Sequence, residues 1–297
     1  MISKEIFYKF CEEGEFSKIK LFYKYMNLTD DEKYLAFAIS IDNQNMDIIK
    51  FFINEKVKIH MKNNDNIYPL IFAAANCNYK IFKLLEKLVD IKKISEENSI
   101  YPLSHAIRFG NYKIVKLLLK RDILIDYDEH FDINPICSAV KYNQLKILKS
   151  IINNPNFCFD SEIECVYINE TTEINDILDN KLCPLCIAAK YGNYKIVKYL
   201  INNNHIKHEI NNVDFLPLCF ASKFNKIKIV KYFIKLDNSS LESYDNYALR
   251  IACKNCNYKI VKFLINNGAN ILTNDNYCLR ISCKNGWFKI VKLLIRE

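Results

Sequence analysis

Cysteine and histidine side chains occur in this sequence at spacings that metal ions use. Three pairs of potential metal ligands have two residues between their members: Cys183 and Cys186, Cys253 and Cys256, and His205 and His208. Zinc binds four such ligands at about 2.0–2.3 Å from one centre. Whether two pairs can share an ion therefore depends on how far apart the elements that carry them lie.

Basic side chains recur at regular intervals and offer binding chemistry. One set has a single cation per interval: Arg108, Lys141, Lys190, Lys223, Lys254 and Lys284. An aromatic residue follows four of these cations: Phe109, Tyr142, Tyr191 and Phe224. A second set consists of lysine pairs: Lys80/Lys83, Lys113/Lys116, Lys146/Lys149, Lys195/Lys198, Lys228/Lys231, Lys259/Lys262 and Lys289/Lys292. A row of cations attracts an acidic partner, and aromatic and arginine side chains are frequent interface hot spots.

The sequence offers no comparable basis for catalysis. It contains no glycine-rich phosphate loop, no G-x-S-x-G motif and no H-E-x-x-H motif. We therefore expect no enzyme activity, no catalytic residue and no cofactor.

One stretch of sequence recurs and carries both sets of cations. It reads YALRIACKNCNYKIVKFLINN over 247–267 and YCLRISCKNGWFKIVKLLIRE over 277–297. The residue before its first apolar position serves as a marker, and the markers are Pro69, Pro102, Pro135, Pro184, Pro217, Ala248 and Cys278. Most steps between markers are close to 33 residues. The pattern predicts two short helices per repeat, joined by a tight turn.

A period of 33 residues with two helices is the ankyrin pattern. The repeats resemble the ankyrin family, whose unit is roughly T-P-L-H-x-A-A-x-x-G-H-x-E-I-V-K-L-L-L; the stretch from Tyr101 reads YPLSHAIRFGNYKIVKLLL. The resemblance implies an all-α ankyrin solenoid of about nine helix-turn-helix repeats. The repeats are rich in lysine, asparagine and isoleucine, as in NYKIVKYLI. This composition is similar to that of the ankyrin families of giant DNA viruses (mimivirus-like).

Three positions of each repeat are predicted to be buried against neighbouring helices. The first is Leu70, Leu103, Ile136, Leu185, Leu218, Leu249 and Leu279. The second, where small side chains allow close helix packing, is Ala73, Ala106, Ala139, Ala188, Ala221, Ala252 and Ser282. The third is Ile81, Ile114, Ile147, Ile196, Ile229, Ile260 and Ile290. The turn requires a positive φ, which suits Gly110, Gly192, Gly286, Asn143 and Asn225 but not Cys256.

The repeats depart from the family at its threonine and histidine positions. Tyrosine, cysteine, leucine or asparagine replaces the threonine, and Arg250 and Arg280 are among the replacements of the histidine. The hydroxyl–imidazole bonds that tie the family's hairpins are therefore missing. We expect a less stable stack, because loss of an N-cap hydroxyl costs about 1 kcal/mol per site.

One step of 49 residues interrupts the period and defines the predicted domain organisation. A degenerate capping repeat occupies 1–33, repeats occupy 34–154 and 181–297, and an acidic insertion occupies 155–180. The acids of the insertion are Asp160, Glu162, Glu164, Glu170, Glu173, Asp176 and Asp179, with no lysine or arginine between them. Two interpretations stay open: a tolerated surface loop, or a specificity element that covers nearby cations.

The resemblance also implies where a partner binds. In the family, the single-cation position lies on the inner helix and faces a concave groove, beside the hairpin fingers. The predicted partner-binding residues are Arg108, Lys141, Lys190, Lys223, Lys254, Lys284, Phe109, Tyr142, Tyr191, Phe224 and the finger residues Tyr68, Tyr101, Tyr247 and Tyr277. The implied function is a non-catalytic protein–protein interaction scaffold, acting as a viral effector on a host protein.

Two alternatives stay open beside that function. The lysine pairs of the second helices offer binding of nucleic acid or another anionic surface. The last repeat ends with Leu293, Leu294 and Ile295 and no polar cap, so self-association or another partner at that end is the second alternative.

Composition indicates the compartment in which we expect the protein. The net charge is +8. The 12 cysteines are interpreted mainly as small buried apolar residues rather than as disulfide partners. We therefore expect a reducing, intracellular compartment, the cytoplasm. No apolar run is long enough for a membrane span.

The two Cys-x-x-Cys pairs lie two repeats apart, about 20 Å along a helix stack, so one zinc ion cannot join them. We expect no metal site.

Overall fold

The computed structural model describes residues 3–58, 69–76, 78–91, 102–121, 135–155, 183–203, 216–236, 241 and 243–296. Within these residues the regular elements are helices and no strand is present. The chain divides into two compact parts, Met1–Cys158 and Phe159–Glu297. Each part consists of helical hairpins, as predicted for an ankyrin solenoid. Of the predicted acidic insertion, residues 156–180 lie outside the described residues.

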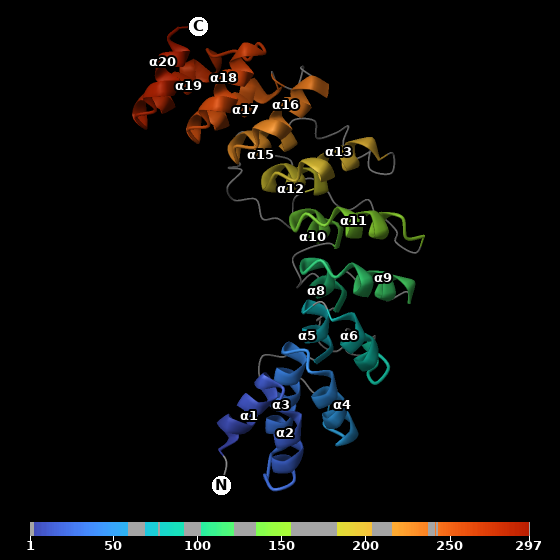
Figure 1. Ribbon diagram of the computed structural model, residues 1–297. Helices are drawn as coiled ribbons and strands as arrows, with labels where there is room; N and C mark the ends of the chain where they lie inside the picture. Colours follow the sequence, from blue (N-terminus) through green and yellow to red (C-terminus); the bar gives the residue numbers. More distant parts are fainter. Residues whose placement is uncertain are drawn as a thin grey trace. The chain divides into compact units, whose positions relative to one another are not determined.

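Among its described residues, the N-terminal part contains five helical hairpins, which can be followed along the chain in Figure 1. The first helices of successive hairpins, α1, α3, α5, α8 and α10, pack against one another in chain order, and each packs against its own second helix. The bounds are α1 Lys4–Glu13, α2 Phe16–Tyr23, α3 Asp30–Asp42, α4 Met46–Asn54, α5 Pro69–Ala75, α6 Tyr79–Leu85, α8 Pro102–Arg108, α9 Tyr112–Lys120, α10 Pro135–Lys141 and α11 Leu145–Ile152.

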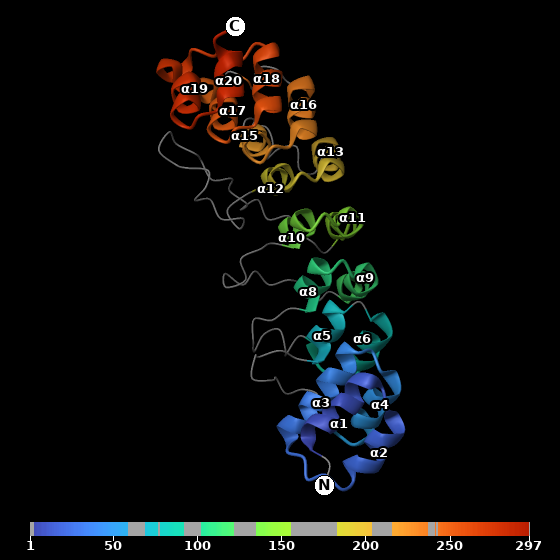
Figure 2. The ribbon, with the colours of Figure 1, turned by 60° about the vertical axis from the view of Figure 1, so that its left-hand side comes forward.

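The C-terminal part contains four hairpins built in the same way (Figure 2). First helices α12, α15, α17 and α19 form one row of contacts, and second helices α13, α16, α18 and α20 form another. The bounds are α12 Pro184–Tyr191, α13 Tyr194–Asn202, α15 Leu216–Lys223, α16 Ile227–Leu236, α17 Ser243–Lys254, α18 Tyr258–Asn266, α19 Thr273–Lys284 and α20 Phe288–Leu294.

The predicted core positions are buried, which confirms the repeat register. Every member of the small-residue position, from Ala73 to Ser282, has no exposed surface, and the isoleucine position is equally closed. The leucine position is buried in every repeat except the last, where Leu279 is half-buried. Burial of the stripes on both helices needs the neighbouring hairpin, so the free energy of unfolding depends on contacts between repeats.

The turns inside the hairpins have the predicted backbone conformation. Gly110, Gly192 and Gly286 have φ of 76°, 85° and 70°, and Asn143 and Asn225 have φ of 58° and 57°. Cys256 occupies the same turn with φ of 57°, although it is neither glycine nor asparagine. The left-handed conformation costs such a residue about 1–2 kcal/mol.

Arginine–carbonyl bonds tie the last two hairpins where the family uses threonine and histidine. Arg250 Nε donates to the Asp245 carbonyl at 3.0 Å, and Arg280 Nη2 donates to the Asn274 carbonyl at 3.1 Å. Both carbonyls belong to short left-handed segments that lie within the bounds of α17 and α19, close to their first residues. In these two repeats an arginine–carbonyl bond therefore takes the place of the missing hydroxyl–imidazole bond. The lower stability expected for the stack stays a prediction.

Asparagine side chains link consecutive repeats at the helix ends. Asn257 Nδ2 donates to the carbonyls of Ser222 and Lys223 at 2.7 and 2.8 Å. Asn45 Nδ2 donates to the Cys11 carbonyl at 3.0 Å in the same manner. The last carbonyls of a helix have no partner within it, so each asparagine satisfies the end of the preceding repeat's first helix.

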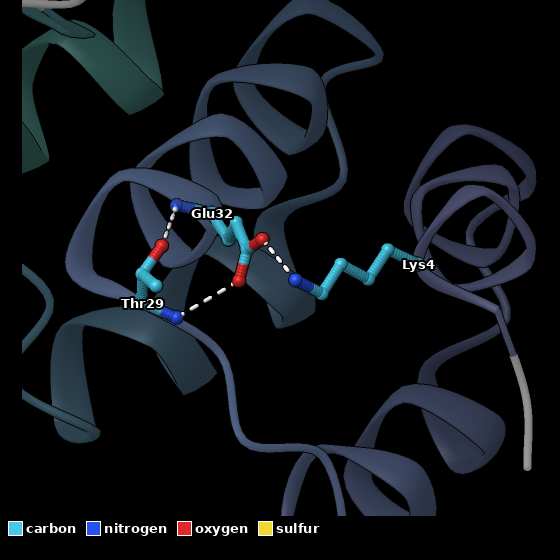
Figure 3. Close-up of polar contacts among 3 residues, drawn as sticks. All are labelled: Lys4, Thr29 and Glu32. Carbon is cyan, nitrogen blue, oxygen red and sulfur yellow. Dashed lines mark hydrogen bonds and ion pairs between the residues drawn. The ribbon is translucent and has the colours of Figure 1, made fainter.

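A capping box fixes the start of α3 and joins the first two repeats (Figure 3). Thr29 Oγ1 accepts a hydrogen bond from the Glu32 N–H at 3.3 Å, and the Thr29 N–H donates to Glu32 Oε2 at 2.9 Å. Lys4, on α1, forms an ion pair with the other carboxylate oxygen of Glu32. The contact ties α1 to the N-terminus of α3.

The cysteines follow the prediction with one correction. Cys11, Cys137, Cys186, Cys219 and Cys253 are buried free thiols. Burial raises the pKa of the Cys11 thiol to about 12, so it stays protonated at neutral pH. Cys283 was expected at a buried helix position but is exposed. Its counterpart Cys253 is covered by α19, whereas no helix of the described residues packs on the equivalent side of α19.

Candidate functional site

The predicted single cations all lie in the last turn of a first helix. Arg108, Lys141, Lys190, Lys223, Lys254 and Lys284 occupy that turn in α8, α10, α12, α15, α17 and α19. A cation there interacts favourably with the helix dipole, so each one also stabilises its own helix. We call these cations, with Phe109, Tyr142, Tyr191 and Phe224, the cation–aromatic row.

Cations of the row lie over aromatic rings of their own repeat and of the next one. In the N-terminal part, the Arg108 guanidinium lies 5.7 Å from the Phe109 ring centroid and 5.9 Å from that of Tyr142. These distances fall within the range of cation–π attraction. Arg108 therefore joins the ends of α8 and α10.

The C-terminal part repeats this arrangement. Lys190 Nζ lies 5.9 Å from the Tyr191 ring centroid and 5.6 Å from that of Phe224 in the following repeat. Lys223 Nζ approaches the same Phe224 ring at 4.9 Å. Two cations and two rings from α12, α15 and their turns thus form one cluster. The sequence placed these residues at equal intervals but did not reveal their contacts across repeats.

The rings of the row stay accessible beneath the cations. Phe109 and Tyr191 are 50% and 38% exposed. Tyr142 and Phe224 are half-buried, and Lys254 and Lys284 are exposed. Asparagine replaces the aromatic residue after Lys254 and Lys284. In the N-terminal part, cations and apolar rings therefore lie together at α8 and α10. In the C-terminal part they lie together at α12 and α15, whereas α17 and α19 carry the cation without a following aromatic residue.

The predicted finger tyrosines have a structural contact where they are described. The Arg250 guanidinium lies 5.1 Å from the Tyr247 ring centroid and 5.8 Å from that of Tyr277. Both tyrosines are half-buried. Arg250 thus joins the starts of α17 and α19, and the tyrosines contribute to this junction. Tyr68 and Tyr101 lie outside the described residues.

The Cys183-x-x-Cys186 spacing has a local explanation. Cys183 is the N-cap residue of α12, and its Sγ accepts a hydrogen bond from the Cys186 N–H at 3.4 Å. This is the role that a threonine hydroxyl has at an N-cap. In the part of the chain that the structure describes, no three His, Cys, Asp or Glu side chains gather as a metal site. His205 and His208 lie outside that part.

Comparison with known proteins decides the family. A family model described as ankyrin repeats (3 copies) matches residues 70–162, 136–245 and 185–275, which together cover more than half of the chain. The chain belongs to the ankyrin-repeat family. A search of curated proteins found no match. The crystal structure of the human ASB11 ankyrin repeat domain is similar, with a TM-score of 0.56, 20% identity, and coverage of 77% of this chain and 98% of that one.

Membership of the ankyrin-repeat family explains the helical hairpins and sets the general class of activity. Ankyrin repeats generally mediate protein–protein interactions, consistent with a non-catalytic scaffold. The likeness to ASB11, at 20% identity, concerns the fold alone. None of the helices that the structure describes has the length and apolar character needed to cross a membrane.

Proposed function

We propose that this ankyrin-repeat chain is a non-catalytic scaffold that binds an acidic protein through the cation–aromatic row. The observation that carries the proposal is the shared cluster of Lys190, Tyr191, Lys223 and Phe224, in which each cation lies over a ring of the next repeat or of its own. Contacts between the side chains hold them in place before a partner arrives, which lowers the entropic cost of binding.

The chemistry of the row defines the partner. In the C-terminal part, carboxylates of the partner pair with the heads of Lys190 and Lys223, and an apolar side chain packs on the exposed part of Tyr191. In the N-terminal part, Arg108 and Phe109 offer the same pair of contacts. A segment that alternates acidic and apolar residues meets both requirements. The excess of positive charge, +8 for the chain, speeds the approach of such a segment.

The amino-acid composition of the repeats indicates which organism could supply this partner. Their resemblance to ankyrin families of giant DNA viruses supports an effector that engages a protein of the infected host. The proposed binding chemistry is the same whatever the source.

The test is affinity capture from host lysate with two charge-reversed variants. In one, Lys190→Glu and Lys223→Glu alter the row. In the matched control, Lys195→Glu and Lys228→Glu alter exposed lysines on the second helices of the same two repeats. We expect the first variant to fold, with a lower thermal midpoint because a negative charge at a helix C-terminus opposes the helix dipole, and to lose the captured protein at temperatures well below that midpoint. We expect the control to retain the captured protein. Retention by the first variant, or loss by the control alone, overturns the proposal.

A further inference from the structure

The second helices of the C-terminal part carry many lysines and no acidic residue. Helices α13, α16, α18 and α20 read YKIVKYLIN, IKIVKYFIKL, YKIVKFLIN and FKIVKLL. Their lysines are all exposed: Lys195, Lys198, Lys228, Lys231, Lys235, Lys259, Lys262, Lys289 and Lys292. We call this set the second-helix lysine face.

Contacts between the four helices make the lysine face continuous within the C-terminal part. Helix α13 packs against α16, α16 against α18, and α18 against α20 (Figure 2). Neighbouring helices pack about 8–10 Å apart, so four of them span roughly 30 Å. One turn of duplex nucleic acid has nearly the same length, about 34 Å.

Within the part of the chain that the structure describes, no acidic side chain compensates the charges of the face. Among the described residues, none of these nine lysines forms an ion pair; the recorded pairs involve α1 to α4 with their flanking residues, and Arg121 with Glu86. Like charges three or four residues apart on a helix repel by about 0.2–0.5 kcal/mol per pair. A polyanion that binds the face relieves this repulsion and releases its own counterions.

We propose that the second-helix lysine face binds the phosphate backbone of double-stranded nucleic acid without reading its sequence. The four helices contain lysine but no arginine. Lysine contacts a phosphate as a point charge, whereas bidentate recognition of a base is typical of arginine. The face therefore offers backbone contacts that position a duplex and no contacts that specify a sequence.

The aromatic residues of the face favour a duplex over a single strand. Single-strand binding uses open aromatic rings on which bases stack. Here Lys198 Nζ lies 5.5 Å from the Tyr194 ring centroid and 5.6 Å from that of Tyr232, and both tyrosines are half-buried. Their rings also contact each other edge to face at 5.6 Å. These two rings stabilise the lysine positions and are not free for stacking. Phe288 of α20 is 75% exposed, but single-strand binding stacks successive bases on several rings, so one open ring does not favour a single strand.

A membrane surface fits the face less well than a duplex. Helices that lie on a membrane insert a large apolar face between the lipids. The large apolar side chains of α13 and α18 are buried or half-buried, and the exposed positions of these helices are held by lysine and asparagine. On α16 and α20 two large apolar side chains, Leu236 and Phe288, are exposed. They lie on helices that both pack on α18, which exposes no apolar side chain, so the face has no continuous apolar surface to insert.

The experiment measures binding of a 20-base-pair DNA duplex and an RNA duplex of equal length over a series of salt concentrations. The variant carries Lys195→Gln, Lys228→Gln, Lys259→Gln and Lys289→Gln, one change on each helix. The control carries Lys20→Gln, Lys24→Gln, Lys50→Gln and Lys87→Gln, four exposed lysines of the N-terminal part with the same change of net charge. Thermal unfolding checks that both variants fold.

We expect binding of either duplex by the wild type, with a Kd of about 10⁻⁴ to 10⁻⁶ M at physiological salt. Each phosphate contact adds about 0.9 to the salt slope, so the variant loses about 3 to 4 from the slope and at least about tenfold in affinity at low salt, whereas the control keeps both. Equal binding by wild type and variant overturns the proposal. So does tighter binding of single-stranded DNA, phosphatidylserine vesicles or poly-glutamate than of duplex.

Discussion

At the scale of single residues, Cys256 shows where the repeat pattern conflicts with backbone geometry. It is exposed in the turn before α18 and adopts φ of 57°, where other repeats place glycine or asparagine. Glycine takes up this conformation without steric cost. The sequence predicted that cysteine suits the positive φ of this turn poorly. The structure shows that the turn at Cys256 nevertheless has the same positive φ as the turns of the other repeats.

We predict that Cys256→Gly raises the free energy of unfolding by about 1 kcal/mol, because it relieves the left-handed strain. Urea unfolding measures the change. The matched control is Cys283→Gly, an exposed cysteine at a helical position near the end of α19, which should lower stability by about 0.5–1 kcal/mol. A loss of stability in Cys256→Gly would show that the turn is not strained.

Glu32 makes the stability of the N-terminal part depend on pH in the acidic range. The Lys4 ammonium and the Thr29 N–H lower the pKa of the Glu32 carboxyl below its ordinary value. Because the folded pKa is lowered, the charged carboxylate stabilises the fold above the unfolded value. That contribution is lost as the pH falls through the lowered folded pKa.

We therefore expect the thermal midpoint of the wild type to fall on acidification below about pH 4.5, and Glu32→Gln to show a smaller fall. Differential scanning calorimetry across this range measures both. Asp30, whose pKa Lys58 lowers in the same direction, stays intact in the variant and accounts for part of the remaining dependence. Identical pH profiles for the two proteins would contradict the assigned role of Glu32.

At the scale of elements, an ion pair joins the ends of two second helices. Glu86, at the end of α6, has a fully buried side chain, and Arg121, at the end of α9, donates to its Oε1 at 3.1 Å. The other oxygen, Oε2, has no hydrogen-bond partner among the described residues. The Glu86 charge thus depends on Arg121 alone for a direct partner.

Removal of the arginine should leave a buried carboxylate without compensation. We predict that Arg121→Ala lowers the free energy of unfolding by about 2–4 kcal/mol. In a Glu86→Gln background the same change should cost less than half as much, because no charge is left unpaired. A double-mutant cycle from urea unfolding measures the coupling. A coupling energy near zero would mean that solvent, not Arg121, compensates the charge of Glu86.

The sequence predicted the elements well because their signals are local. The marker prolines coincide with the first residues of α5, α8, α10 and α12, and the predicted turns have positive φ. The missed features are contacts across repeats. The contact of Arg250 with the Tyr277 ring and the Asn257 bonds to the preceding repeat depend on how neighbouring hairpins are placed. The period fixes which residues are equivalent but not which atoms meet.

At the scale of the whole molecule, the last repeat carries the prediction of self-association. Phe288 and Ile295 of this repeat are 75% and 70% exposed. We predict a concentration-dependent dimer of this chain, which the double change Phe288→Ser and Ile295→Ser abolishes because it removes exposed apolar surface. Sedimentation equilibrium over a wide concentration range measures the effect. A monomer at every concentration would reject the prediction.

The central claim is that the cation–aromatic row binds the protein partner. Amide hydrogen exchange of the chain, alone and with the captured partner, tests it most directly. We expect slower exchange at the end of α12 and in the turns that follow α12 and α15, at 191–193 and 224–226, with little change along α13 and α16. Protection confined to α13 and α16, with the two turns unaffected, would contradict it.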